Sequence, residues 1–302
     1  MAHEHQHPSS TWRLAVALGI AVALFVIQLI GARLTGSLAL LADTAHVAVD
    51  AAGLLIGFGA AMIARRPTSQ RHTWGWQRAE VLGALFQAMV LIGVGAYIVV
   101  EALRRMWEPV EVPGGMLLWF GVFGLFGNLI AFAVLTTGSN QSLNLRAATL
   151  EVLADALGSV AVIISALLIQ FAGWAGADSI AALLIGVLVM PRAFGVFREA
   201  MNVLLEATPP GLDLTEVRGH LLGVDQVRSV HDLHASRVST SVPVLTAHVV
   251  LDESCFDNGE SIAVLQQLRS CVAEHFPVSI EHSTFQLESA ALACELTEAH
   301  HN

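Results

Sequence analysis

Long apolar runs separated by short polar stretches fill the first two thirds of the chain. A helix needs about 20 mostly apolar residues to cross a bilayer. Six segments have this length and character: about 11–32, 38–64, 81–100, 116–137, 145–172 and 179–197. The pattern predicts a bundle of six transmembrane helices.

Arginines flank these predicted spans unevenly. Because the number of spans is even, both termini lie on one side of the membrane. That side carries eight arginines: Arg13, Arg65, Arg66, Arg71, Arg78, Arg146, Arg192 and Arg198. The opposite side carries three: Arg33, Arg104 and Arg105. Basic residues concentrate in cytoplasmic loops, so we expect both termini in the cytoplasm.

The pattern changes after the sixth predicted span. The run Thr208-Pro209-Pro210-Gly211 is typical of a helix stop and a domain boundary. Beyond it, the periodicity predicts, in order, a helix, two strands, a helix and a strand at 212–222, 227–238, 242–251, 259–276 and 278–287. Asn258 is the expected N-cap of the second helix. The order αββαβ favours a small α+β domain with its helices on one side of the sheet.

These patterns divide the chain into four parts. We expect an N-terminal tail that contains histidines (1–10), a six-helix transmembrane domain (11–207), a cytoplasmic domain (208–290) and a C-terminal tail (291–302). A cytoplasmic domain of roughly 80 residues would be marginally stable alone and would gain from contacts in a dimer.

Composition supports a membrane protein. Only 13% of the residues are charged, against about 25% in soluble domains. The net charge of -10 leaves no basic footprint for nucleic acid. The three cysteines form no CxxC pair and no disulfide framework.

Ionisable residues inside two of the spans carry the candidate chemistry. His46 and Asp50 lie four residues apart in the second span, and Glu151 and Asp155 lie four apart in the fifth. Residues at i and i+4 share one face of a helix. An aspartate at a helix centre costs roughly 2.5–3.5 kcal/mol on insertion scales. Two such helices facing each other would supply four ligands, the number that zinc prefers in a tetrahedral site.

Two other interpretations fit the same residues. They could form a polar cluster that joins helices, or a proton relay that binds no metal. Two spaced pairs on separate helices favour the metal site.

Several stretches resemble the cation diffusion facilitator family, most closely its bacterial cobalt-zinc-cadmium resistance exporters. GSLALLADTAHVAVDAAGLL and LNLRAATLEVLADALGSVAVI are similar to the family's second and fifth helices, and WGWQRAEVLGALFQ to the start of its third. VHDLHASRV and EHSTFQLE resemble strands of its cytoplasmic domain. The resemblance implies a homodimer in the bacterial inner membrane, proton-coupled antiport, and a metallochaperone-like cytoplasmic domain of ferredoxin-like fold.

One residue departs from the pattern of many zinc-transporting members. Glu151 stands where those members carry a second histidine. With three ionised carboxylates and a neutral His46, the empty site would carry -3, and a bound M²⁺ would leave -1. Like charges in a low-dielectric site favour protonation. We therefore expect the empty site to take up protons that the arriving metal expels, and selectivity for zinc alone becomes less secure.

Two further acidic residues lie near this predicted site. Asp43 precedes His46 by three residues and could join the same helix face and bind the metal. Otherwise we expect it to line the entry path or to bond to a ligand. Glu80 lies near the cytoplasmic end of the third span, where it could pair with Arg78 or a neighbouring arginine, or shape the entrance.

Histidines outside the membrane form a second candidate set. His231, His248 and His282 each lie in a predicted strand, and the resemblance implies that these positions ligate metal in relatives. They would form a site at the dimer interface, or they are ordinary surface histidines. His3, His5 and His7 could capture metal loosely, or belong to a plain terminal tail.

Together these features predict a proton-coupled antiporter that exports divalent cations, Zn²⁺ first and also Cd²⁺ and Co²⁺. Its partners would be the metal, protons, membrane lipid and a second copy of the chain, with no prosthetic group. One alternative is a transporter of the same fold that mainly exports Mn²⁺, Fe²⁺ or Ni²⁺. Another is a membrane metal sensor or scaffold. An enzyme is not expected, because the chain has no HExxH motif and no nucleophile beside a base in the spans.

Overall fold

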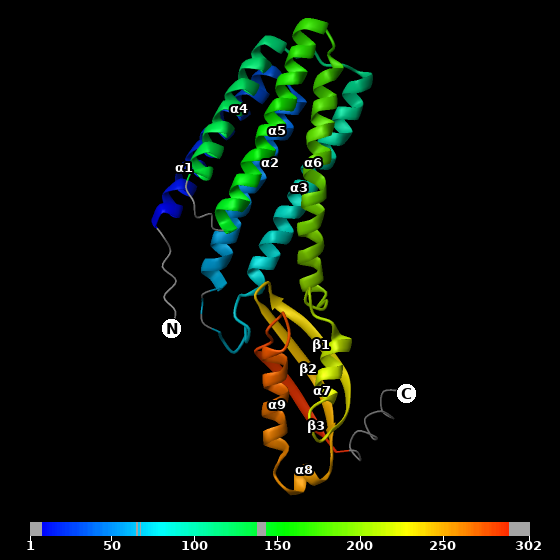
Figure 1. Ribbon diagram of the computed structural model, residues 1–302. Helices are drawn as coiled ribbons and strands as arrows, with labels where there is room; N and C mark the ends of the chain where they lie inside the picture. Colours follow the sequence, from blue (N-terminus) through cyan, green and yellow to red (C-terminus); the bar gives the residue numbers. More distant parts are fainter. Residues whose placement is uncertain (1–7, 65, 67, 138–142, 290–302) are drawn as a thin grey trace. The chain divides into compact units, whose positions relative to one another are not determined.

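The computed structural model describes residues 8–64, 66, 68–137 and 143–289 (Figure 1). The chain divides into two compact units, which are described separately. The first comprises residues 1–56 and 86–197, and the second comprises residues 57–85 and 198–302. Three long helices, α2, α3 and α6, contribute residues to both units.

Six long helices occupy the first two thirds of the chain (Figure 1). They are α1 (Pro8–Thr35), α2 (Leu38–Ala64), α3 (Arg78–Trp107), α4 (Gly114–Thr136), α5 (Leu143–Ala172) and α6 (Gly176–Leu204). Among the described residues, α1, α3, α4, α5 and α6 are long and apolar enough to cross a membrane. The second predicted span corresponds to α2, and its crossing stays a prediction.

Large apolar side chains cover the outside of these helices. Phe126 of α4, Phe171 of α5 and Val187 of α6 are among many that are more than half exposed. In water such a surface would be costly, whereas in a bilayer it faces hydrocarbon. The exposure of these side chains therefore agrees with a membrane domain.

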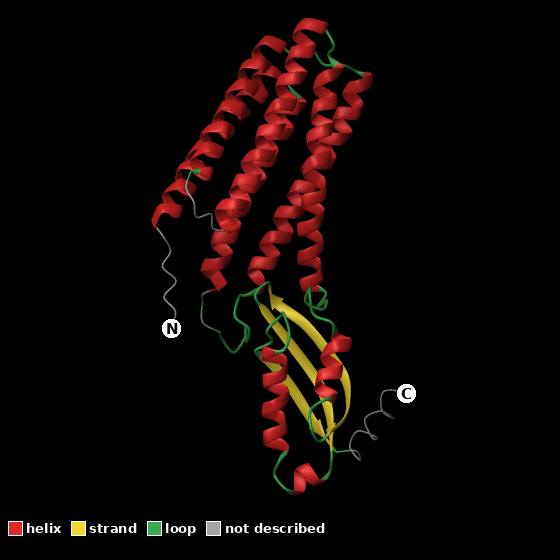
Figure 2. Cartoon of the chain, viewed as in Figure 1, coloured by secondary structure: helices red, strands yellow, loops and turns green. Residues whose placement is uncertain are grey.

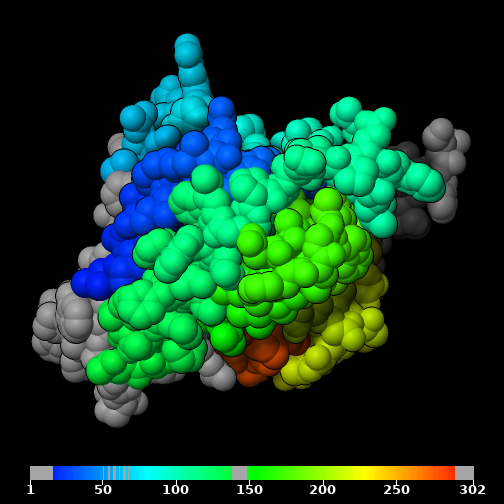
Figure 3. Space-filling view, turned by 90° about the horizontal axis from the view of Figure 1, so that it is seen from above, coloured from blue at the N-terminus to red at the C-terminus, as the bar shows by residue number. Residues whose placement is uncertain are grey.

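Glycines let α4 pack closely between α1 and α5 (Figure 3). A Cβ atom at Gly127 would lie 2.6 Å from Leu24 of α1, and one at Gly121 would lie 2.9 Å from Ile163 of α5. Small residues of this kind let helix backbones approach in membranes. The close approach brings polar side chains of the three helices together.

The start of α2 is capped by a side chain from α6. Asp178 accepts hydrogen bonds from the Ser37 hydroxyl at 2.5 Å and from the backbone N–H of Leu38 at 2.6 Å. Both polar side chains are buried. The first N–H groups of a helix lack partners within the helix, so the carboxylate of Asp178 satisfies them and anchors α2 against α6.

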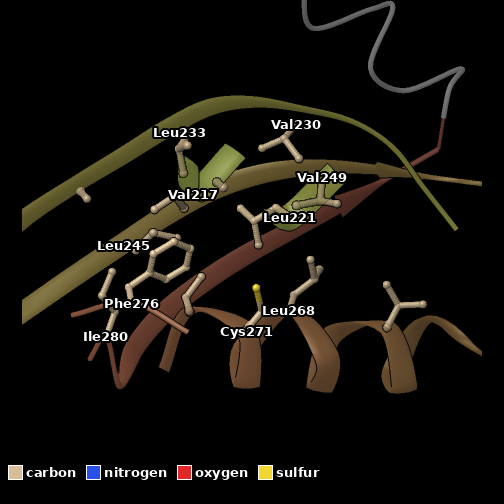
Figure 4. Close-up of a cluster of buried hydrophobic side chains, with 14 of the residues drawn as sticks. Val217, Leu221, Val230, Leu233, Leu245, Val249, Leu268, Cys271, Phe276 and Ile280 are labelled. Atoms are coloured by element: carbon tan, nitrogen blue, oxygen red, sulfur yellow. The ribbon is translucent and has the colours of Figure 1, made fainter. Parts of the chain in front are cut away.

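The cytoplasmic domain has a three-stranded sheet covered on one face by two helices (Figure 2). Its elements are α7 (Leu214–Leu222), β1 (Val227–Ser239), β2 (Val242–Leu251), α8 (Ser254–Asp257), α9 (Ser261–Glu274) and β3 (His282–Glu288). The strand order is β1-β2-β3, with β1 antiparallel and β3 parallel to β2. Buried side chains such as Val217, Leu245 and Leu268 fill the layer between sheet and helices (Figure 4).

The predicted order αββαβ is present, with the short helix α8 added. Asn258 is the C-cap of α8, because its N–H bonds to the carbonyl of Ser254, and the N-cap of α9 is Glu260. The N-cap prediction was therefore wrong. The strand predicted from residue 278 begins only at His282. The ferredoxin-like assignment stays a prediction.

Candidate metal centres

Helices α2 and α5 bring one member of each predicted pair together. Nε2 of His46 lies 3.6 Å from Oδ1 of Asp155. The His46 side chain is 9% exposed and that of Asp155 is 20% exposed. An imidazole nitrogen and a carboxylate oxygen at this separation are placed to share a borderline divalent ion.

The second residues of the two pairs are placed differently. Asp50 lies in α2 one turn after His46, but its side chain lies outside the described residues. Glu151 lies in α5 one turn before Asp155, and its carboxylate forms an ion pair with Arg192 of α6. The spacing of residues in the sequence does not predict Arg192 as the partner of Glu151.

Arg192 changes the charge of the predicted site. The three predicted carboxylates and a divalent ion sum to -1 when His46 is neutral, so one guanidinium beside them makes the total zero. In the sequence, Arg192 is a single basic residue near the end of an apolar span. Ionisable groups in spans usually pair, so its position indicates an acidic partner in a neighbouring helix. Its partner could not be chosen without the rotation of α6 against α5.

Asp43 is buried beside the pair rather than at it. Nε2 of Gln28 in α1 donates a hydrogen bond to Oδ2 of Asp43 at 2.7 Å, and Gly158 of α5 lies against its other oxygen. Gln28 also lines a cavity of about 20 Å³, together with Asn128, Asp155 and mostly apolar neighbours. This space is sufficient for about one water molecule. Gln28 thus contacts Asp43 and lines the same small cavity as Asp155.

Glu80 has a different neighbour from the one expected. Its Oε1 accepts a hydrogen bond of 3.2 Å from the hydroxyl of Thr240, in the turn between β1 and β2. Arg78 pairs instead with Glu206, at 3.1 Å. In the second unit, Glu80 therefore joins the start of α3 to the sheet.

A second cluster lies on the sheet of the cytoplasmic domain. His231 and His248 are direct partners in the β1–β2 register, and their ring centroids are 5.1 Å apart. Glu288 of β3 is fully buried, with Oε1 at 2.8 Å from Nδ1 of His248 and Oε2 at 3.4 Å from Nε2 of His231. One ligand atom from each of the three residues lies within 4.8 Å of the others. Two imidazoles and a carboxylate are a common ligand set for zinc.

His282 is not part of this cluster within one chain. It begins β3, six residues before Glu288, which corresponds to about 20 Å along a strand. Its ring meets the edge of Trp74 with centroids 5.4 Å apart. Sequence reasoning missed Glu288, although an acidic residue at the end of an apolar, alternating strand was the available signal. His3, His5 and His7 lie outside the described residues.

Comparison with known proteins agrees with this architecture. Residues 14–205 match the model of the cation efflux transmembrane domain, and residues 209–290 match that of the cytoplasmic domain of cation efflux proteins. The chain therefore belongs to the cation efflux family, the cation diffusion facilitators, and is an integral membrane protein.

Three curated relatives are similar over nearly the whole chain. The metal cation efflux system protein CzcD of Cupriavidus metallidurans is 39% identical, covering 98% of this chain and 92% of the relative. The zinc transporter ZitB of Escherichia coli is also 39% identical, covering 95% and 93%. A cadmium, cobalt and zinc/H(+)-K(+) antiporter of Bacillus velezensis is 33% identical, covering 96% and 93%.

One solved structure, the metal-bound C-terminal domain of the CzcD transporter, is 35% identical to this chain. It covers 26% of this chain and 99% of its own, with a TM-score of 0.22.

Proposed function

We propose that this protein exports divalent transition-metal cations from the cytoplasm, Zn²⁺ first and Cd²⁺ and Co²⁺ as well. The observation that carries the proposal is the approach of His46 to Asp155 between two apolar helices. The ion would bind these two side chains together with Asp50 and Glu151. In this proposal α2 also crosses the membrane, which brings the number of spans to six. Both termini are cytoplasmic, and the protein resides in a bacterial inner membrane. The names of the relatives support the same cargo.

The export is coupled to protons in this proposal. The carboxylates of the transport site bind protons after the metal leaves, and an arriving metal expels them. Arg192 holds Glu151 in the described state, so its guanidinium competes with the ion for the carboxylate of Glu151. Each proton that moves inward gains roughly 2.3 kcal/mol per 100 mV of membrane potential. The relative named as an H(+)-K(+) antiporter supports ion exchange.

The protein works as a homodimer that carries a second metal site in its cytoplasmic domain. His231, His248 and Glu288 are the ligands within one chain. Burial of a carboxylate is costly even beside neutral imidazoles, and a bound cation would offset the charge of the fully buried Glu288.

Metal uptake into inverted membrane vesicles under a pH gradient tests the transport proposal. The Asp155→Ala and His46→Ala variants should lose Zn²⁺ uptake, by at least about tenfold, because each removes one ligand. Glu108→Gln is the matched control, since this exposed carboxylate of the loop after α3 pairs only with Arg104 among the described contacts. Normal uptake by Asp155→Ala would overturn the site. A wild-type protein that binds zinc but moves none would be a sensor or scaffold instead.

A further inference from the structure

An open groove separates α7 from α9 in the cytoplasmic domain. Its volume is about 710 Å³, and its lining includes His220, Cys271 and His275 together with glutamines and small residues. One potential ligand atom from each of these three residues lies within 4.8 Å of the others. None of the three belongs to the transport site or to the cluster on the sheet.

The two helices bring these side chains together in the groove. Cys271 and His275 are four residues apart at the end of α9, so they share a face. His220 lies in the last turn of α7, and its ring centroid is 5.9 Å from that of His275. The groove thus has a thiol at its base and an imidazole from each helix beside it.

The distances fit a tetrahedral ion after small side-chain rotations. Zn–S and Zn–N bonds of about 2.3 and 2.0–2.1 Å place tetrahedral ligand atoms about 3.3–3.6 Å apart. Separations of up to 4.8 Å must therefore shorten by at most about 1.5 Å. His220 and His275 are exposed and can rotate, whereas Cys271 is fixed in the core at 6% exposure.

We propose that His220, Cys271 and His275 bind one thiophilic divalent cation, Zn²⁺ or Cd²⁺, with water as the fourth ligand. The Cys271 thiol gives its proton to solvent when its sulfur bonds to the metal. The ion links α7 to α9 within one protomer.

The ligand chemistry distinguishes this site from the cluster on the sheet. Thiolate prefers Zn²⁺ and Cd²⁺, whereas the carboxylate of Glu288 also accepts harder ions. The groove site should therefore discriminate against Mn²⁺ more strongly than the sheet cluster does.

Titration of the metal-stripped full-length protein in detergent with Cd²⁺ tests this site. Bonding of Cd²⁺ to a thiolate gives a charge-transfer absorption in the ultraviolet, which reports sulfur ligation directly. All variants carry Cys294→Ser, so that the thiol of the C-terminal tail does not contribute. The band should appear in this background and saturate at one Cd²⁺ per protomer.

Matched variants then separate the groove from the other sites. Cys271→Ser should abolish the band, whereas Cys255→Ser, at the other buried free cysteine, should retain it. His231→Gln, in the sheet cluster, should also retain it. The double variant His220→Gln/His275→Gln should weaken Cd²⁺ binding to the thiolate by at least about tenfold.

Two results would overturn the proposal. One is a band that persists in Cys271→Ser, and the other is unchanged Cd²⁺ affinity in the double histidine variant. If Cys271→Ser fails to fold, the double histidine variant decides alone, because both of its positions are exposed.

Discussion

At the scale of single residues, the ion pair between Glu151 and Arg192 changes the electrostatics of the transport site. Residue spacing alone leaves the predicted site with an excess negative charge. The guanidinium of Arg192 balances that excess and gives Glu151 a partner that competes with the metal. The cation that neutralises the site therefore comes from α6, outside the two helices that supply the ligands.

Glu151→His tests how this residue sets metal preference. The variant replaces a carboxylate by an imidazole and removes the acidic partner of Arg192. Zinc uptake should rise relative to cobalt uptake, or the pH optimum of uptake should move, in either case by roughly severalfold in rate at fixed pH. Vesicle uptake of both metals from pH 6 to pH 8 measures this. Glu108→His is the control outside the site, and an unchanged ratio together with an unchanged optimum would refute the role given to Glu151.

At the scale of helices, close packing positions the buried Asp43. Asp43 is held between Gln28 of α1 and Gly158 of α5. A side chain at Gly158 would push the carboxylate away from its hydrogen bond. Gly158 therefore leaves the space that the carboxylate of Asp43 occupies.

Gly158→Ala should therefore destabilise the membrane domain. Overpacking usually costs about 1–3 kcal/mol, and here it also disturbs a buried hydrogen bond. The melting temperature in detergent and the rate of zinc uptake should both decrease. Gly195→Ala in α6 is the matched control, because nothing lies within 4 Å of its added Cβ. An alanine there should be neutral or slightly stabilising, since it lowers the entropy of the unfolded chain. Equal melting temperatures for the two variants would contradict the packing role of Gly158.

The N-terminus of α7 carries a prediction about pH. The Asp213 carboxylate accepts a hydrogen bond of 2.7 Å from the Thr215 N–H, and that bond lowers the pKa of Asp213. A folded-state pKa below the unfolded value of about 3.9 gives stability that is present above that value. This stability is lost as the pH falls through the folded pKa. Asp213→Ala should lower the melting temperature at pH 7, and the difference from wild type should shrink below about pH 4. Asp213→Asn keeps a capping oxygen, so it should melt close to wild type at pH 7.

At the scale of the whole molecule, much of the architecture follows from the sequence. Six long helices appear where apolar runs predict them, because a lipid-facing helix must be apolar over its length. The i, i+4 spacing also predicts that α2 and α5 present ligands to each other, and His46 and Asp155 do lie together.

Contacts between separate elements could not be predicted from the sequence, because they depend on how those elements pack. Arg192 reaches Glu151 only at one rotation of α6. Glu288 joins the sheet histidines because β3 runs parallel to β2 in one particular register, and because His231 pairs with His248 across β1 and β2. His220 and Cys271 meet only once α7 and α9 lie on one face of the sheet. Local periodicity determines which side of an element a residue occupies, but not which element packs against it.

Zinc binding to the cytoplasmic domain should appear as a change in the stability of the whole protein. A ligand that binds only the folded state adds about 2.7 kcal/mol at a free concentration of 100 times its Kd. Zinc should therefore raise the melting temperature of the metal-stripped protein, and chelator should reverse the rise. The Asp155→Ala background removes the contribution of the transport site.

In that background, His231→Gln/His248→Gln separates the sheet cluster from the groove. These substitutions leave Glu288 buried without an imidazole, so the metal-free variant should melt below its parent. The decisive quantity is thus the zinc-induced shift within each variant. That shift should decrease in the sheet variant and decrease separately in His220→Gln/His275→Gln, because the two sites share no ligand. A full zinc shift in the sheet variant would show that His231, His248 and Glu288 form a structural polar cluster. If each double variant keeps the full zinc-induced shift and only the combination of both loses it, one ion exchanges between the two sites of the domain.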